Sequence, residues 1–345
     1  MSENAYAKAG VNRDTENETK EEMESVLETT DARVLNTIGA FATLFDGLFP
    51  EYKHPVLVMK TEEPGTKQLL ALQNDSAETV CEDLVNHLVN DCIVMGARPL
   101  SIQDCIICGK VEKPIVLRMV KAFADAAKNN ECTLTGGETS WQPGMIAEGR
   151  YILTASIVGV VEKERIIDGG KIREGDAILA LASNGVHTNG ISLVRKIMED
   201  SPDILKEKIG DKRFVQAVLT PHRAYYKAVK DLFPQDGLVG LAHITGGGIK
   251  ENLDRILPDT LNAAIDLPKI RILPIFALLK KFGGLDDGDM LRTFNMGVGM
   301  TAVVRPDFAQ EAIAHLKASG VEAYEIGIIT QGSKDVIFKG ELQWE

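Results

Sequence analysis

Residues 177–198 read AILALASNGVHTNGISLVRKIM, and this stretch decides the fold class. The unbroken apolar run at 177–181 predicts a buried strand. A loop follows at 183–190, with two glycines, two asparagines and one histidine, and a helix is expected at 191–198. A strand that feeds a helix through such a loop is typical of proteins that mix α and β elements.

Strands and helices alternate along the rest of the chain as well. Apolar residues recur at helical spacing after Ser76, until Gly96 and Pro99 end the pattern, and again at 115–128. Further strands are expected at 54–59, 100–108, 131–134, 151–161, 241–244 and 297–304, and a further helix at 250–256. The sequence therefore predicts an α/β (α+β) fold.

The length of the chain predicts more than one domain. It has 345 residues, and a domain takes up about 150 residues. The segment around 163–175 turns polar and contains glycines, which marks a boundary. We predict a polar arm over 1–30, an N-terminal α/β domain over 31–168 and a C-terminal α/β domain over 169–345.

The composition argues against several classes of protein. With 38 Lys and Arg against 50 Asp and Glu, the net charge is −12, and such a surface repels nucleic acid and anionic lipid. No apolar run approaches the roughly 20 residues of a membrane span, and the N-terminus does not read as an export signal. Five cysteines in a chain of this length form no disulfide framework, so a cytoplasmic protein is expected.

Two glycine clusters are candidate phosphate-binding loops. They are Thr135-Gly136-Gly137-Glu138-Thr139 and Thr245-Gly246-Gly247-Gly248, and each follows a predicted strand. Adjacent glycines let the backbone approach an anion and direct N–H groups at it. The alternative is a tight turn without a ligand. Neither cluster has the spacing of a P-loop or of a dinucleotide fold.

Acidic residues form a candidate metal site. On the helix after Ser76, Asp91 falls within the apolar stripe, and Asp83, His87 and Asn90 follow its flank. A carboxylate near a core is costly unless it is paired or binds a metal, so a buried salt bridge is the competing interpretation. If Glu62, Asp91, Asp104 and Glu138 converge at strand ends, they offer the oxygen ligands that Mg²⁺ prefers.

Basic and nucleophilic candidates are fewer. Lys67 follows Gly65 and Thr66 and is a candidate phosphate ligand, with a surface role as the alternative. His187, between Asn184 and Asn189, is a candidate acid–base or substrate-orienting group. The spacing of Cys105 and Cys108 has no second pair to complete a zinc site, and no G-x-S-x-G elbow is present.

The motifs together resemble the phosphoribosylformylglycinamidine cyclo-ligase family, also called aminoimidazole ribonucleotide synthetases. The likeness runs from residues 6–11 to 326–329. The stretches that carry it are GGET at 136–139 with PGM at 143–145, SNGVHTNGISLVRK at 183–196, AHITGGG at 242–248, RTFNMGVGM at 292–300 and VND at 89–91.

This resemblance implies an enzyme of purine biosynthesis that uses ATP and Mg²⁺ to close the imidazole ring of its ribonucleotide substrate. It also implies a homodimer whose N-terminal sheets pair. Carried onto this chain, the metal ligands are Glu62, Asp91 and Glu138, and the catalytic residues are Lys67, Asp91 and His187. The nucleotide would contact Glu62, Gly65, Thr66, Lys67, Asn90, Asp104, Gly136, Gly137 and Glu138. The ribonucleotide would contact Asn184, His187, Asn189, Thr245, Gly246 and Gly247.

The chain departs from the family pattern on the nucleotide side. The family turn D-G-V-G-T-K reads Glu62-Glu63-Pro64-Gly65-Thr66-Lys67 here, and G-G-F-G is reduced to GAFA at 39–42. SWQ stands at 140–142, where the family has A-E-M. Two alternatives therefore stay open: a paralogue that transfers phosphoryl groups to another substrate, and a catalytically silent ribonucleotide-binding protein.

Overall fold

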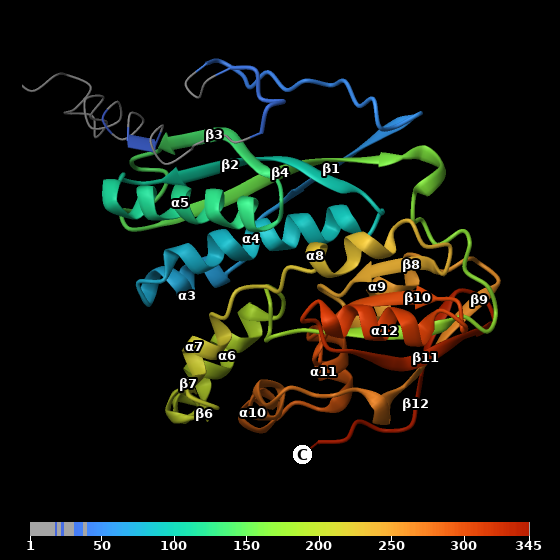
Figure 1. Ribbon diagram of the computed structural model, residues 1–345. Coiled ribbons are helices and arrows are strands. Elements are labelled where there is room, and N and C mark those ends of the chain that lie inside the picture. Colours follow the sequence, from blue (N-terminus) through green and yellow to red (C-terminus); the bar gives the residue numbers. More distant parts are fainter. Residues whose placement is uncertain (1–17, 19–21, 24–30, 37–39, 345) are drawn as a thin grey trace, which may run out of the picture. The chain divides into compact units, whose positions relative to one another are not determined.

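The computed structural model describes residues 18, 22–23, 31–36 and 40–344. The chain forms two compact units (Figure 1). The N-terminal unit comprises Met1–Cys92 and Arg98–Glu162, and the C-terminal unit comprises Ile93–Ala97 and Lys163–Glu345. The predicted arm over 1–30 lies outside the described residues except at 18, 22 and 23, and so does Gly39. The domain limits 31–168 and 169–345 stay a prediction.

The N-terminal unit is built on a four-stranded sheet in the order β1-β4-β2-β3. Its strands are β1 (Pro55–Glu62), β2 (Arg98–Cys108), β3 (Thr133–Trp141) and β4 (Tyr151–Glu162). Strands β2 and β3 are parallel, while β4 runs antiparallel to both β1 and β2. A parallel pair requires a crossover connection, and helix α5 (Lys113–Asn129) supplies it.

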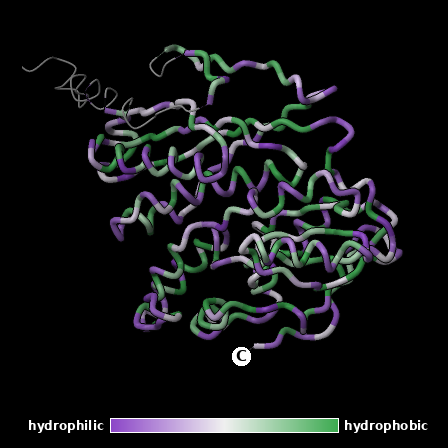
Figure 2. The backbone as a smooth tube through the Cα atoms, viewed as in Figure 1, coloured by the Kyte–Doolittle hydropathy of each residue, from purple (hydrophilic) through white to green (hydrophobic). Residues whose placement is uncertain are grey.

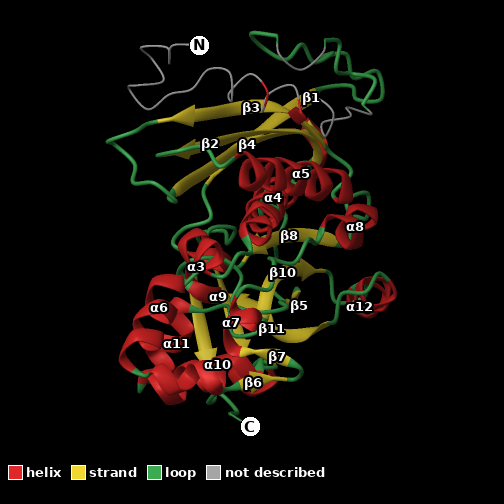
Figure 3. Ribbon diagram, turned by 90° about the vertical axis from the view of Figure 1, so that its left-hand side faces the viewer, coloured by secondary structure: helices red, strands yellow, loops and turns green. Residues whose placement is uncertain are grey.

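Helices cover one face of this sheet. Helices α4 (Ala77–Ile93) and α5 lie on the same side of it in both ribbon views, and α3 (Lys67–Gln73) precedes α4 (Figures 1 and 3). The other face keeps large apolar side chains in the open, since Leu57 is 53% exposed, Met59 74% and Ile152 42%. This open apolar face is the main surface feature of the N-terminal unit.

The C-terminal unit contains a six-stranded sheet in the order β12-β9-β11-β5-β10-β8. Its strands are β5 (Ala177–Ala182), β8 (Leu238–His243), β9 (Leu261–Asp266), β10 (Val298–Val304), β11 (Ala323–Gln331) and β12 (Asp335–Lys339). Strands β8 and β10 are buried along their whole length, and Figure 2 shows apolar residues concentrated along the strands of this sheet. This burial explains why they read as continuous apolar runs.

Helices and short elements complete the C-terminal unit. Helix α9 packs on β8 and β12, and α12 packs on β5 and β11. The α-helices are α6 (Ile191–Asp200), α7 (Phe214–Val218), α8 (Tyr226–Val229), α9 (Gly248–Asp254), α10 (Pro274–Gly283), α11 (Asp287–Thr293) and α12 (Ala309–Ala318). The 3₁₀-helices are η1 (Lys163–Arg165), η2 (Pro202–Lys206), η3 (Lys230–Leu232) and η4 (Leu267–Lys269), and β6 (Lys208–Ile209) pairs with β7 (Lys212–Arg213).

The mixed α/β architecture is confirmed, and three local predictions are corrected. The predicted turn at 135–139 lies inside β3, because Gly136 takes a φ of 127° and the register shifts there, so the strand continues through a bulge. Helix α3 begins at Lys67, where only a turn was expected. On α4 the flank residues Asp83 and Asn90 are fully buried, whereas Asp91 is half-buried.

Candidate functional site

The end of β1 and the last turns of α4 bring two predicted metal ligands together around a lysine. The Lys60 ammonium lies 2.7 Å from the Glu62 carboxylate and 3.3 Å from the Asp91 carboxylate. His87, one turn before Asp91 on α4, places its Nε2 3.7 Å from the same carboxylate. Because Glu62 and Asp91 already converge on one positive charge, their donor oxygens fit a cation such as Mg²⁺.

Asp104 lies in the same cross-strand row as Glu62. The register pairs both residues with Ala155 of β4, so their side chains are on the same face of the sheet. Burial raises the pKa of the Asp104 carboxyl to about 7. A buried carboxyl group with so perturbed a pKa is a functional-site candidate.

Gly137 of β3 gives this carboxyl group its space. A Cβ atom on Gly137 would lie 2.1 Å from the Asp104 carbonyl oxygen and 2.4 Å from its Oδ1. The sequence predicted that glycines here let the backbone approach an anion. In the structure Gly137 accommodates Asp104 of the adjacent strand, whereas a Cβ on Gly136 would meet only the Thr43 Oγ1 atom, at 3.7 Å.

Glu138 is not brought to Glu62 and Asp91, which corrects the predicted metal set. It pairs in register with Cys105, and successive residues of a strand point to opposite faces, so Glu138 lies on the other face from Asp104. Glu138 is exposed there, and its charge contributes to the raised pKa of the Cys105 thiol, after burial and Asp104. The three predicted ligands therefore divide between two faces of the sheet.

Lys67 lies in the interior of the N-terminal unit. Its ammonium is 2.9 Å from both carboxylate oxygens of Asp83, and both side chains are fully buried. This is the buried salt bridge that was the competing interpretation for a carboxylate on α4. A contact between Lys67 and a phosphate would have to share the ammonium with Asp83.

The turn before Lys67 carries its own anion. The Glu63 carboxylate accepts a hydrogen bond of 2.7 Å from the N–H of Gly65, which has a φ of 61°. Thr66 follows as the N-cap of α3. One N–H group expected to face a phosphate is thus bonded to Glu63, a residue that departs from the family pattern.

In the C-terminal unit the two predicted substrate loops lie side by side. Asn189, in the loop after β5, has its Oδ1 3.5 Å from the position that a Cβ on Gly246 would take. The Asn189 Nδ2 atom is buried and makes no hydrogen bond within the described protein. A buried donor of this kind is rare in a finished protein interior and fits a group that meets a ligand.

A buried asparagine fixes the second of these loops. Asn252 of α9 accepts a hydrogen bond from the Thr245 hydroxyl at 3.1 Å, and its amide donates to the carbonyls of Gly246 and Gly248 at 3.0 and 2.8 Å. Gly247 adopts a φ of 87°, the left-handed region that favours glycine. The loop is therefore held in one conformation, and the assignment of Thr245, Gly246 and Gly247 to the ribonucleotide stays a prediction.

His187 is held within a group of buried histidines. Its Nε2 lies 3.0 Å from the Asn184 Oδ1, and its ring stacks on that of His222 with the centroids 3.8 Å apart. His222 in turn places its Nε2 2.9 Å from the Nε2 of His243. The chain of side chains thus joins the loop after β5 to the end of β8.

Sequence reasoning missed three residues of these arrangements. Lys60 contacts Asp91 of another element, and His222 contacts His187 and His243, which are distant in the chain, so no local pattern marks these two residues. The only available signal was for Asn252, which follows the glycine cluster on a predicted helix.

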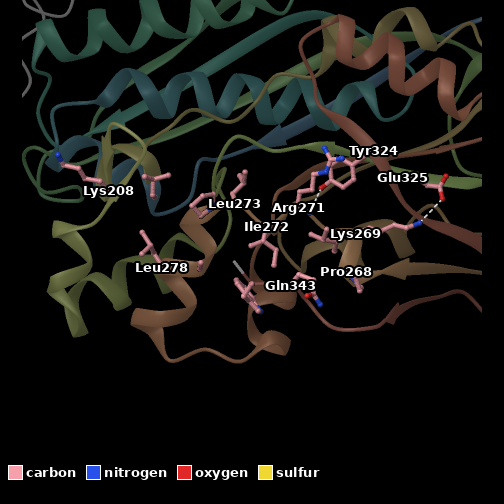
Figure 4. A pocket seen from close by; sticks show the side chains of 15 residues that line it. Lys208, Pro268, Lys269, Arg271, Ile272, Leu273, Leu278, Tyr324, Glu325 and Gln343 are labelled. Carbon is pink, nitrogen blue, oxygen red and sulfur yellow. Dashed lines mark hydrogen bonds and ion pairs between the residues drawn. The ribbon is translucent and has the colours of Figure 1, made fainter.

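A cavity of about 750 Å³ lies elsewhere on the C-terminal unit, and its lining contains none of the predicted site residues. Figure 4 shows Arg271 beside the Tyr324 ring and Lys269 directed toward Glu325. Glu322 binds the Arg271 guanidinium at 2.5 Å. Lys269 and Arg271 are each paired with a carboxylate, so these two basic groups of the lining are not free to bind an anionic substrate. Separately, no helix among the described residues is long and apolar enough to cross a membrane.

Models of two domains match this chain. The model described as AIR synthase related protein, N-terminal domain, matches residues 49–161, and the model for the C-terminal domain of that protein matches residues 173–340.

Known proteins are similar over most of the chain. A phosphoribosylformylglycinamidine cyclo-ligase of Brevibacillus brevis is 39% identical over 353 residues and covers all of both chains. One of Burkholderia cenocepacia is 42% identical over 296 residues, which is 86% of this chain and 84% of that protein. Among solved structures, thiamine-monophosphate kinase from Stenotrophomonas maltophilia has a TM-score of 0.67 at 17% identity, covering 94% and 96% of the two chains. The hydrogenase maturation protein HypE in complex with ATP has a TM-score of 0.66 at 17% identity, covering 92% and 88%.

Proposed function

Because this chain belongs to the AIR synthase related family, we propose that it catalyses the ATP-dependent ring closure of formylglycinamidine ribonucleotide to aminoimidazole ribonucleotide. Matches over 49–161 and 173–340, together with relatives of 39% and 42% identity that carry this activity in their names, support the proposal. The structural observation that carries it is the pair of glycine-bearing loops around Asn189 and Gly246.

The reaction proceeds in two steps on the substrate. The amide oxygen of the formyl-derived group attacks the γ-phosphorus of ATP, ADP leaves, and an iminophosphate forms. An amidine nitrogen then attacks the carbon of that iminophosphate, the C–O bond breaks, and inorganic phosphate leaves as the ring closes. Such chemistry depends on positioning and on neutralisation of charge more than on a protein nucleophile.

We assign the nucleotide to the N-terminal unit. Glu62 and Asp91 would hold Mg²⁺, which neutralises phosphate charge when it is bound. Asp91 and its neighbour Asn90 on α4 would orient the nucleotide. Asp104 lies in the same cross-strand row as Glu62, on the face that would receive the nucleotide. Thr66, Gly65 and Gly136 would face the nucleotide, and Gly137 leaves room beside Asp104.

We assign the ribonucleotide to the C-terminal unit. Asn189 would donate its buried Nδ2–H to the phosphate or the ribose, and the backbone of Thr245, Gly246 and Gly247 would present N–H groups to the phosphate. His187 and Asn184 would orient the reacting amide, since the hydrogen bond between them fixes the imidazole ring.

The functional form is proposed to be a cytoplasmic homodimer. The open apolar face of the N-terminal sheet supports this assignment, because Leu57 and Met59 stand more than half exposed on the face opposite helices α4 and α5. A second copy of the chain would cover this face by pairing sheet against sheet. Size-exclusion chromatography with light scattering tests the dimer, and Met59→Lys should favour the monomer.

One observation favours the rival functions. Glu63 occupies the Gly65 N–H, where a phosphate oxygen would be expected. A paralogue with a different phosphoryl acceptor, or a silent ribonucleotide-binding protein, would tolerate this arrangement.

A single assay separates the three readings. The purified protein is incubated with ATP, Mg²⁺ and formylglycinamidine ribonucleotide, and ADP, phosphate and aminoimidazole ribonucleotide are measured. We expect the three products in equal amounts. Release of ADP only with another acceptor would replace the proposed activity with that of a paralogue. A protein that binds the ribonucleotide but not ATP would be the silent form.

A further inference from the structure

A third histidine connects the two substrate loops of the C-terminal unit. His222 lies between His187 and His243, and the three side chains are 1%, 0% and 5% exposed. The rings of His187 and His222 are stacked, with 24° between their planes, and the two Nε2 atoms of His222 and His243 are 2.9 Å apart. His222 belongs to none of the sequence motifs and has no role in the proposed function.

The hydrogen bonds around these rings define where the protons are. The amide of Asn184 donates from Nδ2 to the carbonyl of Pro221 at 2.9 Å, and a carbonyl oxygen only accepts. This fixes the Asn184 Oδ1 toward His187, so the His187 Nε2 must carry its hydrogen. Between His222 and His243, one Nε2 donates and the other accepts, so only one of these two Nε2 atoms carries a hydrogen.

The fold makes room for this group at the expense of a side chain. A Cβ on Gly299 of β10 would lie 1.9 Å from the Tyr225 hydroxyl oxygen and 2.8 Å from the His187 Cε1. The Tyr225 hydroxyl donates to the carbonyl of Ala182 at 2.9 Å and so anchors the segment that carries His222 to the end of β5. The position of the three rings is therefore determined by tightly packed neighbours.

We propose that His222 is a positioning residue of the ribonucleotide site. It holds the His187 ring by stacking and fixes the tautomer of His243 through the N–H···N hydrogen bond. In this way it sets the geometry of the loops at 183–190 and 243–248 relative to each other. This assignment rests on the proposed function for its effect on catalysis, while the fixed tautomers are a property of the ligand-free protein.

The experiment uses the full chain with ¹⁵N-labelled histidine and long-range ¹⁵N–¹H spectra. In the wild type we expect an Nε2–H tautomer for His187 and a hydrogen on only one of the two Nε2 atoms of His222 and His243. His222→Phe keeps a flat ring but cannot form the hydrogen bond, so the His243 Nε2 signal should move away from its wild-type position. His222→Gln offers an amide to His243 but no ring, so it should return the His243 Nε2 signal toward its wild-type position while the His187 signals shift. His315→Phe, whose Nε2 faces the Ala228 carbonyl, is the matched control.

Kinetics add the functional readout. We expect the KM for the ribonucleotide to rise about tenfold in His222→Phe. A change of this size corresponds to the contribution of roughly one hydrogen bond. The kcat should change far less, and His222→Gln should recover part of the KM. Unchanged His187 and His243 resonances in both folded variants would overturn the proposal. So would a rise in KM and a fall in kcat that are equally large in the Phe and Gln variants. Absence of turnover in the wild type would defeat the proposed function but leave the spectra as the test of His222.

Discussion

Removing the buried ammonium of Lys67 should destabilise the N-terminal unit rather than only slow a reaction. The Lys67→Met variant leaves the Asp83 carboxylate in a site where both side chains are fully buried. Loss of one partner of a buried ion pair costs about 3–5 kcal/mol. For a domain of about 150 residues, each kcal/mol lowers the unfolding midpoint by about 2–4 °C, so a fall of roughly 6–20 °C is expected.

Calorimetry with two companion variants tests this reasoning. Lys121→Met breaks a comparable ion pair with Asp125 whose side chains are 63% and 59% exposed, and it should change the midpoint little. Adding Asp83→Val to Lys67→Met removes the stranded charge and should recover most of the stability. A Lys67→Met midpoint equal to that of Lys121→Met would refute the argument. If the double variant is stable but no longer binds ATP, Lys67 also contacts the nucleotide.

Three further predictions concern the same unit. The pKa of Asp104 is raised by burial from 3.8 to about 7, so the folded protein keeps a proton that the unfolded chain releases. Stability should therefore fall as the pH rises from about 4 to 7, by up to about 1.4 kcal/mol per pH unit, and Asp104→Asn should flatten this dependence in urea unfolding. A flat profile in the wild type would contradict the burial argument. Gly137→Ala should cost roughly 1–3 kcal/mol because its Cβ meets backbone at 2.1 Å, whereas Gly47→Ala meets nothing within 4 Å; equal unfolding midpoints would show that β3 yields. Lys60→Met should raise the affinity for Mg²⁺ alone about tenfold by freeing two carboxylates from the ammonium, measured by calorimetric titration against Lys121→Met, and an unchanged affinity would count against a cation position there.

The sequence predicted the elements that local pattern controls. Helices α4 and α5 and strands β5 and β10 lie close to their expected ranges, because apolar periodicity and unbroken apolar runs report burial directly. It failed at β3, where the glycine pair reads as a turn but forms a bulge inside a strand. The close contact between β3 and Asp104 of β2 cannot be predicted from the local sequence of β3 alone.

For the site, the sequence by itself determined which residue types are present: the acidic residues at 62 and 91, the glycine clusters, and the asparagines and histidine of the loop at 183–190. Only the tertiary structure decided how they combine. It placed Glu138 and Asp104 on opposite faces of one sheet, buried Lys67 against Asp83, and aligned His222 with His187 and His243. The physical reason is that hydrogen bonds, ion pairs and ring stacking act over a few ångströms. Residues far apart in the chain come within this distance only after the strands have paired in the folded protein.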